Sequence, residues 1–172
     1  MTALASADPD GRPAPVGATE LRRFMRRWAT GAAVVTSGTA AEPVGCTVNA
    51  LTSVSLDPPL LLISLERNSR TLAGLLRHGS FGVNVLAWRH RRLAAQFAAA
   101  GDRFAGVDYR LVHDVPVLEG SASVAVCRVE RTVPVADHVL VLGSPRWCHR
   151  EEDAEPVVLL EGDYGTAGPG GA

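Results

Sequence analysis

The sequence predicts a mainly β domain, with a barrel-like sheet and a few peripheral helices. Long β-branched runs at 121–133 and 137–148 flank a turn near Pro134, which is the pattern of an antiparallel pair. Apolar runs at 60–65 and 81–86 add buried strands, while helical spacing is confined to short segments. Many strands with few helices favour a β-barrel that carries its helices on the outside.

The composition is that of a single soluble globular domain. The chain has 172 residues, with 47% hydrophobic and 20% charged residues and a net charge of −1. A charge this small gives no reason to expect nucleic acid or an anionic membrane as a partner. No apolar stretch approaches the ~20 residues of a membrane span. We therefore expect a protein that binds neither nucleic acid nor membranes.

The three cysteines and the chain ends complete this outline. Cys46, Cys127 and Cys148 lie far apart without paired metal spacing, and their odd number without an export signal predicts a reducing cytoplasm. Residues 1–17 and 166–172 are rich in small residues, glycine and proline, which predicts disordered tails. The folded domain is then expected over 18–165.

The first predicted helix follows the N-terminal tail. Thr19 is a suitable cap, and the apolar residues after it are spaced for one face while the arginines take the other. Gly31 is expected to end the helix, and 32–36 is predicted to be the first strand. A turn is expected over 37–43. The apolar positions of this helix are Leu21, Phe24, Met25 and Trp28.

The central stretch, GCTVNALTSVSLDPPLLLISL at 45–65, is predicted to be strand on both sides of Asp57-Pro58-Pro59. Thr47, Asn49, Ser53 and Ser55 all occupy odd positions, so in an extended chain they share one face. Hydroxyls, an amide and backbone groups on one face suit a flat heterocycle with many hydrogen-bonding atoms. The spacing equally fits a half-exposed strand whose polar side chains meet water.

A second helix follows this stretch. Asn68 or Ser69 would cap it, and Arg70 and Thr71 add a cation and a hydroxyl at its start. Free N–H groups at such a start favour a phosphate, although an ordinary capped helix has the same pattern. Gly79 is expected to end the helix.

The rest of the chain supplies another helix and more strand. Residues 89–100 are predicted to be helical with Leu93 and Phe97 inward, 101–108 to be a loop and 157–161 to be the last strand. No Gly-x-Gly-x-x-Gly follows a strand, which argues against a Rossmann domain. The sequence also has no nucleophile elbow and no metal-spaced cluster of His or Cys.

Several segments, taken in order, resemble the flavin reductase-like family. They are Thr30-Gly31 before a β-run, GCTVNALTSVSLDPPLLLISL, the Ser69 helix, FGVNVLA, Gln96-Phe97-Ala98, FAGVDY, VPVLEG, and ADHVLVLG before a final Gly-x-Tyr. The resemblance implies an FMN-binding split β-barrel that forms a homodimer. It also implies that NADH or NADPH reduces FMN or FAD, and that the reduced flavin passes to a partner flavin-dependent monooxygenase.

The resemblance also assigns site residues. The segment for the flavin ring corresponds to Thr47, Val48, Asn49, Ala50 and Leu51, followed by Ser53 and Val54. The phosphate segment corresponds to Asn68, Ser69 and Arg70, and the positions near the nicotinamide to His138 and Tyr164.

One departure from the family pattern lies beside this site. The family usually has Gly-Asp-His where this chain has Ala136-Asp137-His138, and a glycine would permit a positive φ or the close approach of a ligand.

The implied chemistry needs few side chains, because hydride passes directly between the two cofactors. Backbone N–H groups of Thr47 to Leu51 would stabilise charge on the flavin. His138 would orient the nicotinamide as the catalytic-site histidine, or else be a sheet histidine satisfied by Asp137. Two functions remain open: an NAD(P)H-dependent flavin reductase, or a split-barrel flavin carrier that does not turn over NAD(P)H.

Overall fold

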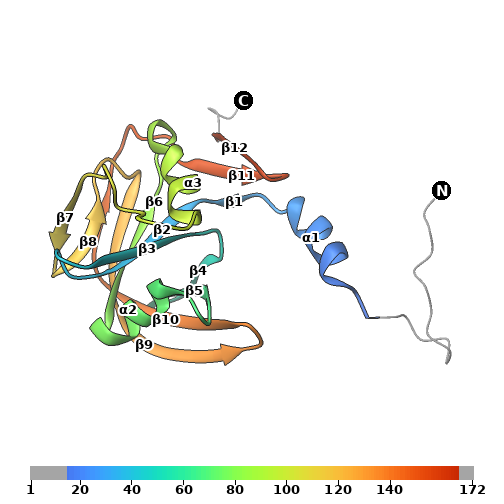
Figure 1. Ribbon diagram of the computed structural model, residues 1–172, viewed down its shortest axis with the longest axis horizontal. Coiled ribbons are helices and arrows are strands. Elements are labelled where there is room, and N and C mark those ends of the chain that lie inside the picture. The colour runs from blue at the N-terminus through green and yellow to red at the C-terminus, as the bar shows by residue number, and fades with distance from the viewer. Residues whose placement is uncertain (1–14, 167–172) are drawn as a thin grey trace.

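The computed structural model describes residues 15–166 and is dominated by one antiparallel sheet of seven strands (Figure 1). In spatial order the strands are β3 (Pro43–Val48), β2 (Ala33–Gly38), β6 (Ser80–Val85), β9 (Ser123–Val135), β10 (His138–Arg150), β5 (Pro59–Glu66) and β4 (Leu51–Leu56). The predicted mainly β fold with peripheral helices is confirmed.

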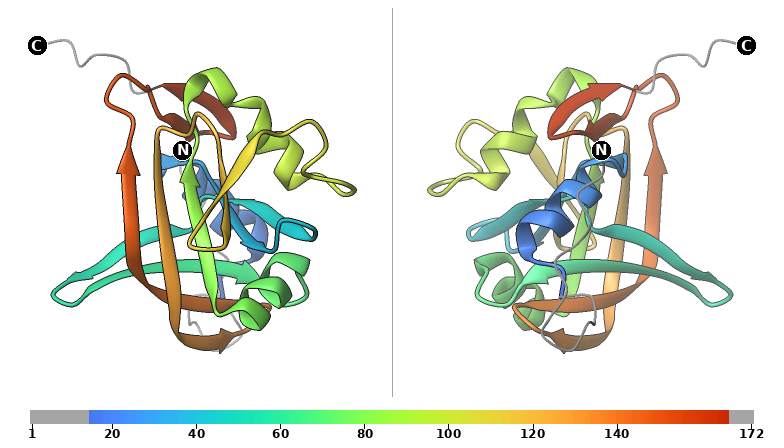
Figure 2. Two further views of the ribbon diagram at one scale, coloured as in Figure 1. Left: turned by 90° about the vertical axis from the view of Figure 1, so that its left-hand side faces the viewer. Right: turned by 90° about the vertical axis from the view of Figure 1, so that its right-hand side faces the viewer.

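The sheet curls so that its two edge strands come together. β3 and β4 lie at opposite ends of the strand order, yet only Asn49 and Ala50 separate them in the chain. The two side views show the strands wrapped around a common interior (Figure 2). This is a barrel split at one seam, as the resemblance implied.

The interior is apolar, with one polar network. Phe81, Ile63 and Leu75 are fully buried at its centre. Asn84 is also fully buried, and its amide donates to the Val34 carbonyl at 2.9 Å while its oxygen accepts from the Leu118 N–H at 2.8 Å. Because each polar atom of this amide has a partner, its burial is tolerated, and it ties the sheet to the segment around Leu118.

Two helices cover the barrel on the side of β2 and β3. Helix α2 (Arg70–His78) has Ser69 as its cap and Gly79 in the left-handed conformation after its last turn, as predicted. The helix predicted at 89–100 is shorter. It begins as the 3₁₀ turn η1 (Trp88–His90) and continues as α3 (Arg92–Ala98), with Phe97 buried and Leu93 half-buried.

The N-terminal helix departs from the prediction. Helix α1 (Ala18–Arg26) is capped by Gly17, whose N–H donates to the Glu20 carboxylate, so the expected Thr19 cap is wrong. The helix does not continue to Gly31, because β1 (Thr30–Gly31) pairs with β11 (Val157–Leu160) instead. Figure 1 shows α1 projecting from the barrel as an arm.

Three further strands were not predicted. One is β12 (Asp163–Thr166), which pairs with the predicted strand β11, and the others are β7 (Tyr109–Val112) and β8 (Val115–Leu118), which pair with each other. The turn expected near Pro134 lies instead at Ala136 and Asp137. Pro134 is tolerated within β9 because β6 pairs with β9 only as far as Arg128, which leaves that edge of β9 free beyond it.

The chain ends contribute little to this description. The tails expected at 1–17 and 166–172 lie outside the described residues, except for 15–17 and 166. In the described part of the chain, no helix has the length and apolar character needed to cross a membrane.

The turn before β10 offers a test of backbone strain. Ala136 has a φ of 49°, in the left-handed region. We expect Ala136→Gly to raise the free energy of unfolding by about 0.5–1 kcal/mol, because that region costs a residue with a Cβ about 1–2 kcal/mol and the flexibility of unfolded glycine offsets part of the gain. Urea denaturation would measure it.

A matched control reverses this change elsewhere. Gly79 has a φ of 67° and open space where a Cβ would lie, so Gly79→Ala adds conformational cost without a clash. It should lower the free energy of unfolding by about 1 kcal/mol. If both substitutions changed the free energy of unfolding equally and in the same direction, the left-handed conformation assigned to Ala136 would be contradicted.

The buried thiol of Cys127 predicts a loss of stability at alkaline pH. Burial raises its pKa to about 12, and the nearby Cys148 adds to the rise. The thiol of the unfolded chain ionises near its usual pKa. The stability that the protonated, buried thiol contributes is therefore intact below that value, and it is lost as the pH rises toward the pKa of the folded state. Between pH 8 and 10.5 we expect Cys127 to remove about 2 kcal/mol from the free energy of unfolding. Cys127→Ala should flatten this pH dependence, whereas exposed Cys148→Ala should leave the Cys127 contribution largely in place.

Candidate active site

A hollow of about 330 Å³ lies where the end of β3 meets β5, β10, α2 and α3. It brings together half of the twelve site residues that the sequence selected, namely Thr47, Val48, Asn49, Ala50, Ser69 and His138. Its lining is Cys46, Thr47, Val48, Asn49, Ala50, Ser64, Leu65, Glu66, Ser69, Phe97, Ala98, Arg103 and His138. The first four residues of the ring segment, the helix cap and the histidine therefore share one cavity although they are far apart in sequence.

The wall of the hollow is the corner at Asn49 and Ala50. The Leu51 N–H donates to the Asn49 carbonyl at 3.0 Å, and the Ser64 N–H donates to the Ala50 carbonyl at 3.2 Å. Among the described residues, the N–H groups of Asn49 and Ala50 themselves have no acceptor. Two adjacent donors without an acceptor thus belong to residues that line the cavity, which suits the polar edge of a heterocycle.

The corner also corrects the expectation of one continuous polar strand face. Thr47 lies in β3 and Ser53 in β4, with Asn49 in the turn between them. The Thr47 hydroxyl donates to the Ala94 carbonyl of α3 at 2.7 Å, so this side chain joins the strand to the helix. The odd-numbered residues were expected to share one strand face. They do not, because the two-residue corner interrupts the alternation of side chains between the two faces.

The floor of the hollow includes the start of α2. The Ser69 hydroxyl accepts from the Leu72 N–H at 3.1 Å, as a capping residue does. The next two N–H groups, of Arg70 and Thr71, belong to the first turn and have no partner within the helix. This free helix start carries partial positive charge, which favours a phosphate.

Arg103 belongs to the site although the sequence analysis did not select it. Its Nε donates to the Ala99 carbonyl at 2.7 Å and its Nη1 to the Gly45 carbonyl at 2.8 Å, so the guanidinium clamps the 101–108 loop onto β3. A Cβ at Gly45 would lie 2.8 Å from the Phe97 ring, so glycine permits this close packing. The loop was recognised in the sequence, but nothing there indicated which strand it would contact.

His138 also lines the hollow, as the first residue of β10. In the sheet it lies opposite Glu66 of β5. Its Nδ1 lies 2.8 Å from a carboxylate oxygen of Asp137. That hydrogen bond is the main reason why the pKa of Asp137 is lowered. Arg67 holds the turn in place, with its N–H on the Asp137 carbonyl at 3.0 Å and its guanidinium on the Ala136 carbonyl at 2.7 Å.

The remaining predicted residues lie outside this lining. Leu51 faces two neighbouring hollows, and Ser53 and Val54 lie in β4 beside an irregularity in its pairing with β5. Tyr164 is in β12, opposite Leu159. Two others lie near the floor: Asn68 is exposed, and the Arg70 guanidinium donates to the Gly101 carbonyl at 2.9 Å.

Cys46 lines the hollow but has the character of a packing residue. Burial raises the pKa of its thiol, against smaller opposing effects of the Thr71 hydroxyl and the Arg103 guanidinium. A protonated, half-buried thiol is a poor nucleophile. The hollow thus offers backbone donors, an arginine, a helix start and a histidine, a set suited to holding a phosphorylated heterocycle.

The comparisons with known proteins agree with this geometry. The flavin reductase like domain profile matches residues 25–168. A "probable flavin reductase" of Rhizobium meliloti is 40% identical over 72% of this chain, and the chain spans 40% of the length of that relative. An "NADH:FMN oxidoreductase" of Rhodococcus qingshengii is 36% identical over 86% of this chain and 80% of its own length.

A solved structure shares the fold over nearly its full length. It is an NADH:FAD oxidoreductase of Streptomyces globisporus C-1027, determined in complex with NAD and FAD fragments. The TM-score is 0.85 at 30% identity, covering 98% of this chain and 100% of that one. The chain belongs to the flavin reductase-like domain family.

Proposed function

We propose that this protein is an NAD(P)H-dependent flavin reductase. It reduces FMN or FAD with NADH or NADPH and supplies the reduced flavin to a partner flavin-dependent monooxygenase. The observation that carries the proposal is the shared hollow, in which the Asn49–Ala50 corner, the α2 start and His138 converge. Family membership and the names of the relatives support the same reaction.

The residues of the hollow fit a flavin. When bound, the flavin supplies the redox chemistry, because its ring accepts hydride from the reduced nicotinamide. The N–H groups of Asn49 and Ala50 bind the polar edge of the ring and stabilise negative charge there. The start of α2 at Ser69 binds the phosphate, and Arg103 adds positive charge beside it.

His138 is assigned the nicotinamide end of the site. It is the hollow's only imidazole, and it is oriented by Asp137 at 2.8 Å. We assign it the role of orienting the nicotinamide carboxamide by hydrogen bonding, so that the two rings are held in register for transfer. Tyr164 and Ser53, which lie outside the hollow of one chain, are retained as predicted contacts without an assigned role.

The alternative of a flavin carrier loses its one sequence-based support. That support was alanine at position 136, where the family usually has glycine. Ala136 nevertheless adopts a φ of 49°, a conformation in which glycine would be comfortable. The turn that presents His138 is therefore formed despite the substitution.

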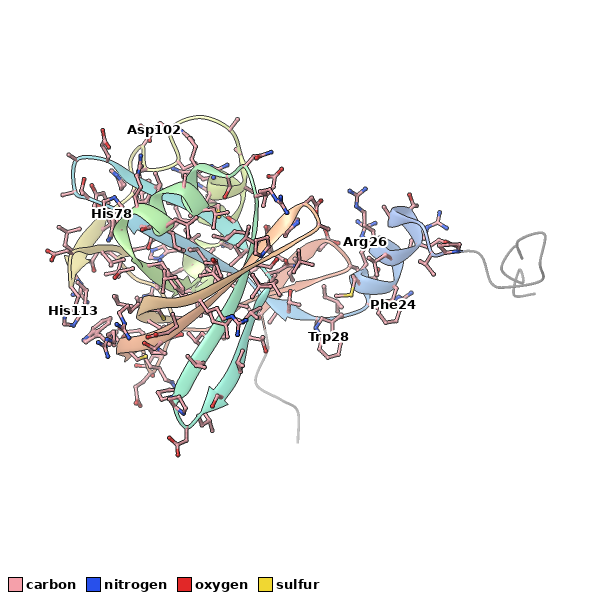
Figure 3. All side chains as sticks on the ribbon, turned by 90° about the horizontal axis from the view of Figure 1, so that it is seen from below. Phe24, Arg26, Trp28, His78, Asp102 and His113 are labelled. Atoms are coloured by element: carbon pink, nitrogen blue, oxygen red, sulfur yellow. The ribbon has the colours of Figure 1, made fainter. Side chains whose placement is uncertain are left out.

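We further propose that 18–165 is one domain that acts as a homodimer in the cytoplasm. All three cysteines are free thiols, which suits a reducing compartment. The strongest argument for a dimer is the α1 arm, none of whose residues is buried. Figure 3 shows Phe24 on this helix, away from the barrel, and Trp28 in the segment that joins the helix to the barrel.

The exposed surface of the arm is unusually apolar. Phe24 is 73% exposed, Trp28 is 68% exposed and Leu21 is 55% exposed. Arg27 anchors the arm to its own chain through an ion pair with Glu161 at 2.7 Å. These exposed apolar side chains support an interface with a second chain, and Trp28 lines a hollow together with Asn49, which supports a position of that interface beside the proposed flavin site.

The dimer predicts a defined response to charge on the arm. Phe24→Glu together with Trp28→Glu should yield monomers by light scattering, because charges would face an apolar interface. Arg23→Glu, on the same exposed helix, should leave the dimer intact. A wild-type monomer with full activity would refute the proposal.

The function is tested by following NADH and NADPH oxidation at 340 nm with FMN and FAD as acceptors. His138→Ala should raise the KM for the pyridine nucleotide or lower kcat by about tenfold or more, the scale of one lost charge-assisted or orienting contact, while flavin affinity stays nearly unchanged. His78→Ala, on the exposed last turn of α2, is the control. Unchanged pyridine-nucleotide kinetics in a stable His138→Ala protein would remove His138 from the site.

A further inference from the structure

Arg67 joins two turns that lead into lining residues of the hollow. It lies in the turn between β5 and α2, directly before Asn68 and the cap at Ser69. The turn between β9 and β10, to which it is hydrogen-bonded, leads into His138. Ser69 and His138 both line the hollow, whereas Arg67 is exposed and lies outside the lining. A residue that holds one turn on the other thus fixes two parts of the hollow relative to each other.

Both the backbone and the side chain of Arg67 hold the β9–β10 turn. Its N–H donates to the Asp137 carbonyl at 3.0 Å, and its Nη2 donates to the Ala136 carbonyl at 2.7 Å. The hydrogen bond with His138 is the main reason for the lowered pKa of Asp137, and the positive charge of Arg67 adds a smaller contribution in the same direction. The backbone bond is available to any residue except proline, but the second bond belongs to the arginine side chain.

Ala136 explains why this turn depends on a side-chain bond. Its φ of 49° lies in the left-handed region, which a residue with a Cβ occupies several-fold less readily than glycine does. One hydrogen bond shifts an equilibrium by about twofold to tenfold, which is the same order of magnitude. The Arg67 side chain therefore offsets much of the strain at Ala136 and holds the turn in its observed conformation.

The conformation of the turn in turn sets the state of the histidine. Asp137 has a lowered pKa, so its carboxylate is ionised and accepts hydrogen bonds only. The contact of 2.8 Å between this carboxylate and Nδ1 of His138 then places the ring proton on Nδ1. In the neutral imidazole, Nε2 is consequently an acceptor. An acceptor at this position suits the NH₂ group of a carboxamide.

We propose that Arg67 is a positioning residue for the reduction, and that it holds the β9–β10 turn so that Asp137 keeps Nε2 of His138 as the acceptor for the nicotinamide carboxamide. The inference rests on the proposed function, which assigns His138 to the nicotinamide. Without the Arg67 side chain, the strained turn at Ala136 relaxes and the Asp137 contact weakens. The imidazole then changes both its direction and its tautomer.

The flavin half of the site does not depend on Arg67 in the same way. The Ser69 cap is a contact within α2, and that helix is anchored in the core by Leu75, which is fully buried. The N–H donors of Asn49 and Ala50 belong to a different turn, between β3 and β4. A substitution at Arg67 therefore separates the two ligands.

The kinetics of Arg67→Gln test the proposal. We expect kcat/KM for the pyridine nucleotide to fall about fivefold, the scale of one lost hydrogen bond, while the dissociation constant of FMN, measured by fluorescence, stays within about twofold. In the His138→Ala background the same change should cost less than about twofold, because the group through which Arg67 acts is absent. In the Ala136→Gly background its cost should also shrink below about twofold, because glycine removes the strain.

Two further variants are matched to this one. Arg67→Lys keeps a donor for the Ala136 carbonyl and should recover part of the lost kcat/KM. Arg131→Gln removes the same charge from an exposed position on β9, in the same hairpin, and should leave kcat/KM unchanged.

Nitrogen NMR of the ligand-free protein examines the histidine without any turnover. The imidazole signals of His138 are identified by their absence in His138→Ala, and they are recorded at mildly alkaline pH, where a free imidazole is neutral. We expect the proton on Nδ1 in the wild type and a mixture of the two tautomers in Arg67→Gln. A wild-type ring protonated on Nε2, or the same tautomer in both proteins, would overturn the proposal.

The remaining outcomes distinguish this inference from the proposed function. Equal losses for FMN and the pyridine nucleotide would give Arg67 a general structural role, and an undiminished loss in the His138→Ala background would show that it does not act through His138. Either result refutes the inference alone, as does normal reduction with unchanged kinetics in Arg67→Gln. If the wild type oxidised neither NADH nor NADPH with any flavin, the proposed function would fail and this inference with it.

Discussion

The site depends on the corner at Asn49 and Ala50. A curled sheet has two edge strands, and here they are joined directly, so the seam of the barrel closes where β3 becomes β4. The bond from the Ser64 N–H to the Ala50 carbonyl, 3.2 Å long, holds that corner against β5. Because β5 also pairs with β10, the corner, Glu66 and His138 are kept at one end of the barrel. A looser corner would leave the N–H donors of Asn49 and Ala50 without a fixed direction.

Charges of both signs lie around the hollow. Arg103 and the free N–H groups at the start of α2 supply positive charge, and Glu66 lies in the same lining, where its carbonyl accepts from the Ser69 N–H at 3.0 Å. The helix start and the guanidinium favour a phosphate there.

Helix α1 differs from the barrel in that it does not pack against the core of its own chain. The barrel satisfies its own core through residues such as Phe81 and Ile63 and through the paired amide of Asn84. The arm has no such support, since its apolar side chains face outward and it is held mainly by Arg27 and the backbone at Arg26. A helix this short is marginal in water without packing. Its exposed apolar face is the observation on which the proposed dimer rests.

The sequence by itself determined the features that depend on neighbours in the chain. Ser69 caps α2 and Gly79 ends it, because capping and the left-handed conformation are local properties of those residue types. The buried strands and the mainly β fold followed from apolar runs in the same way. Of the residues selected on family resemblance, Thr47 to Ala50, Ser69 and His138 share a cavity, whereas Leu51, Ser53 and Val54 lie outside it.

The tertiary structure decided everything that depends on pairing between distant segments. Asn49 was expected on a strand face and lies in a corner, because the alternation of side chains ends where β3 turns into β4. Arg103 joined the site because its loop is clamped to Gly45, and its sequence carries no mark of that partner. Pro134 was expected at a turn and lies in β9, since the end of pairing with β6 frees the edge that proline needs. Helix α1 ends before Gly31 because pairing of Thr30 with Leu159, from the far end of the chain, overrides the local signal.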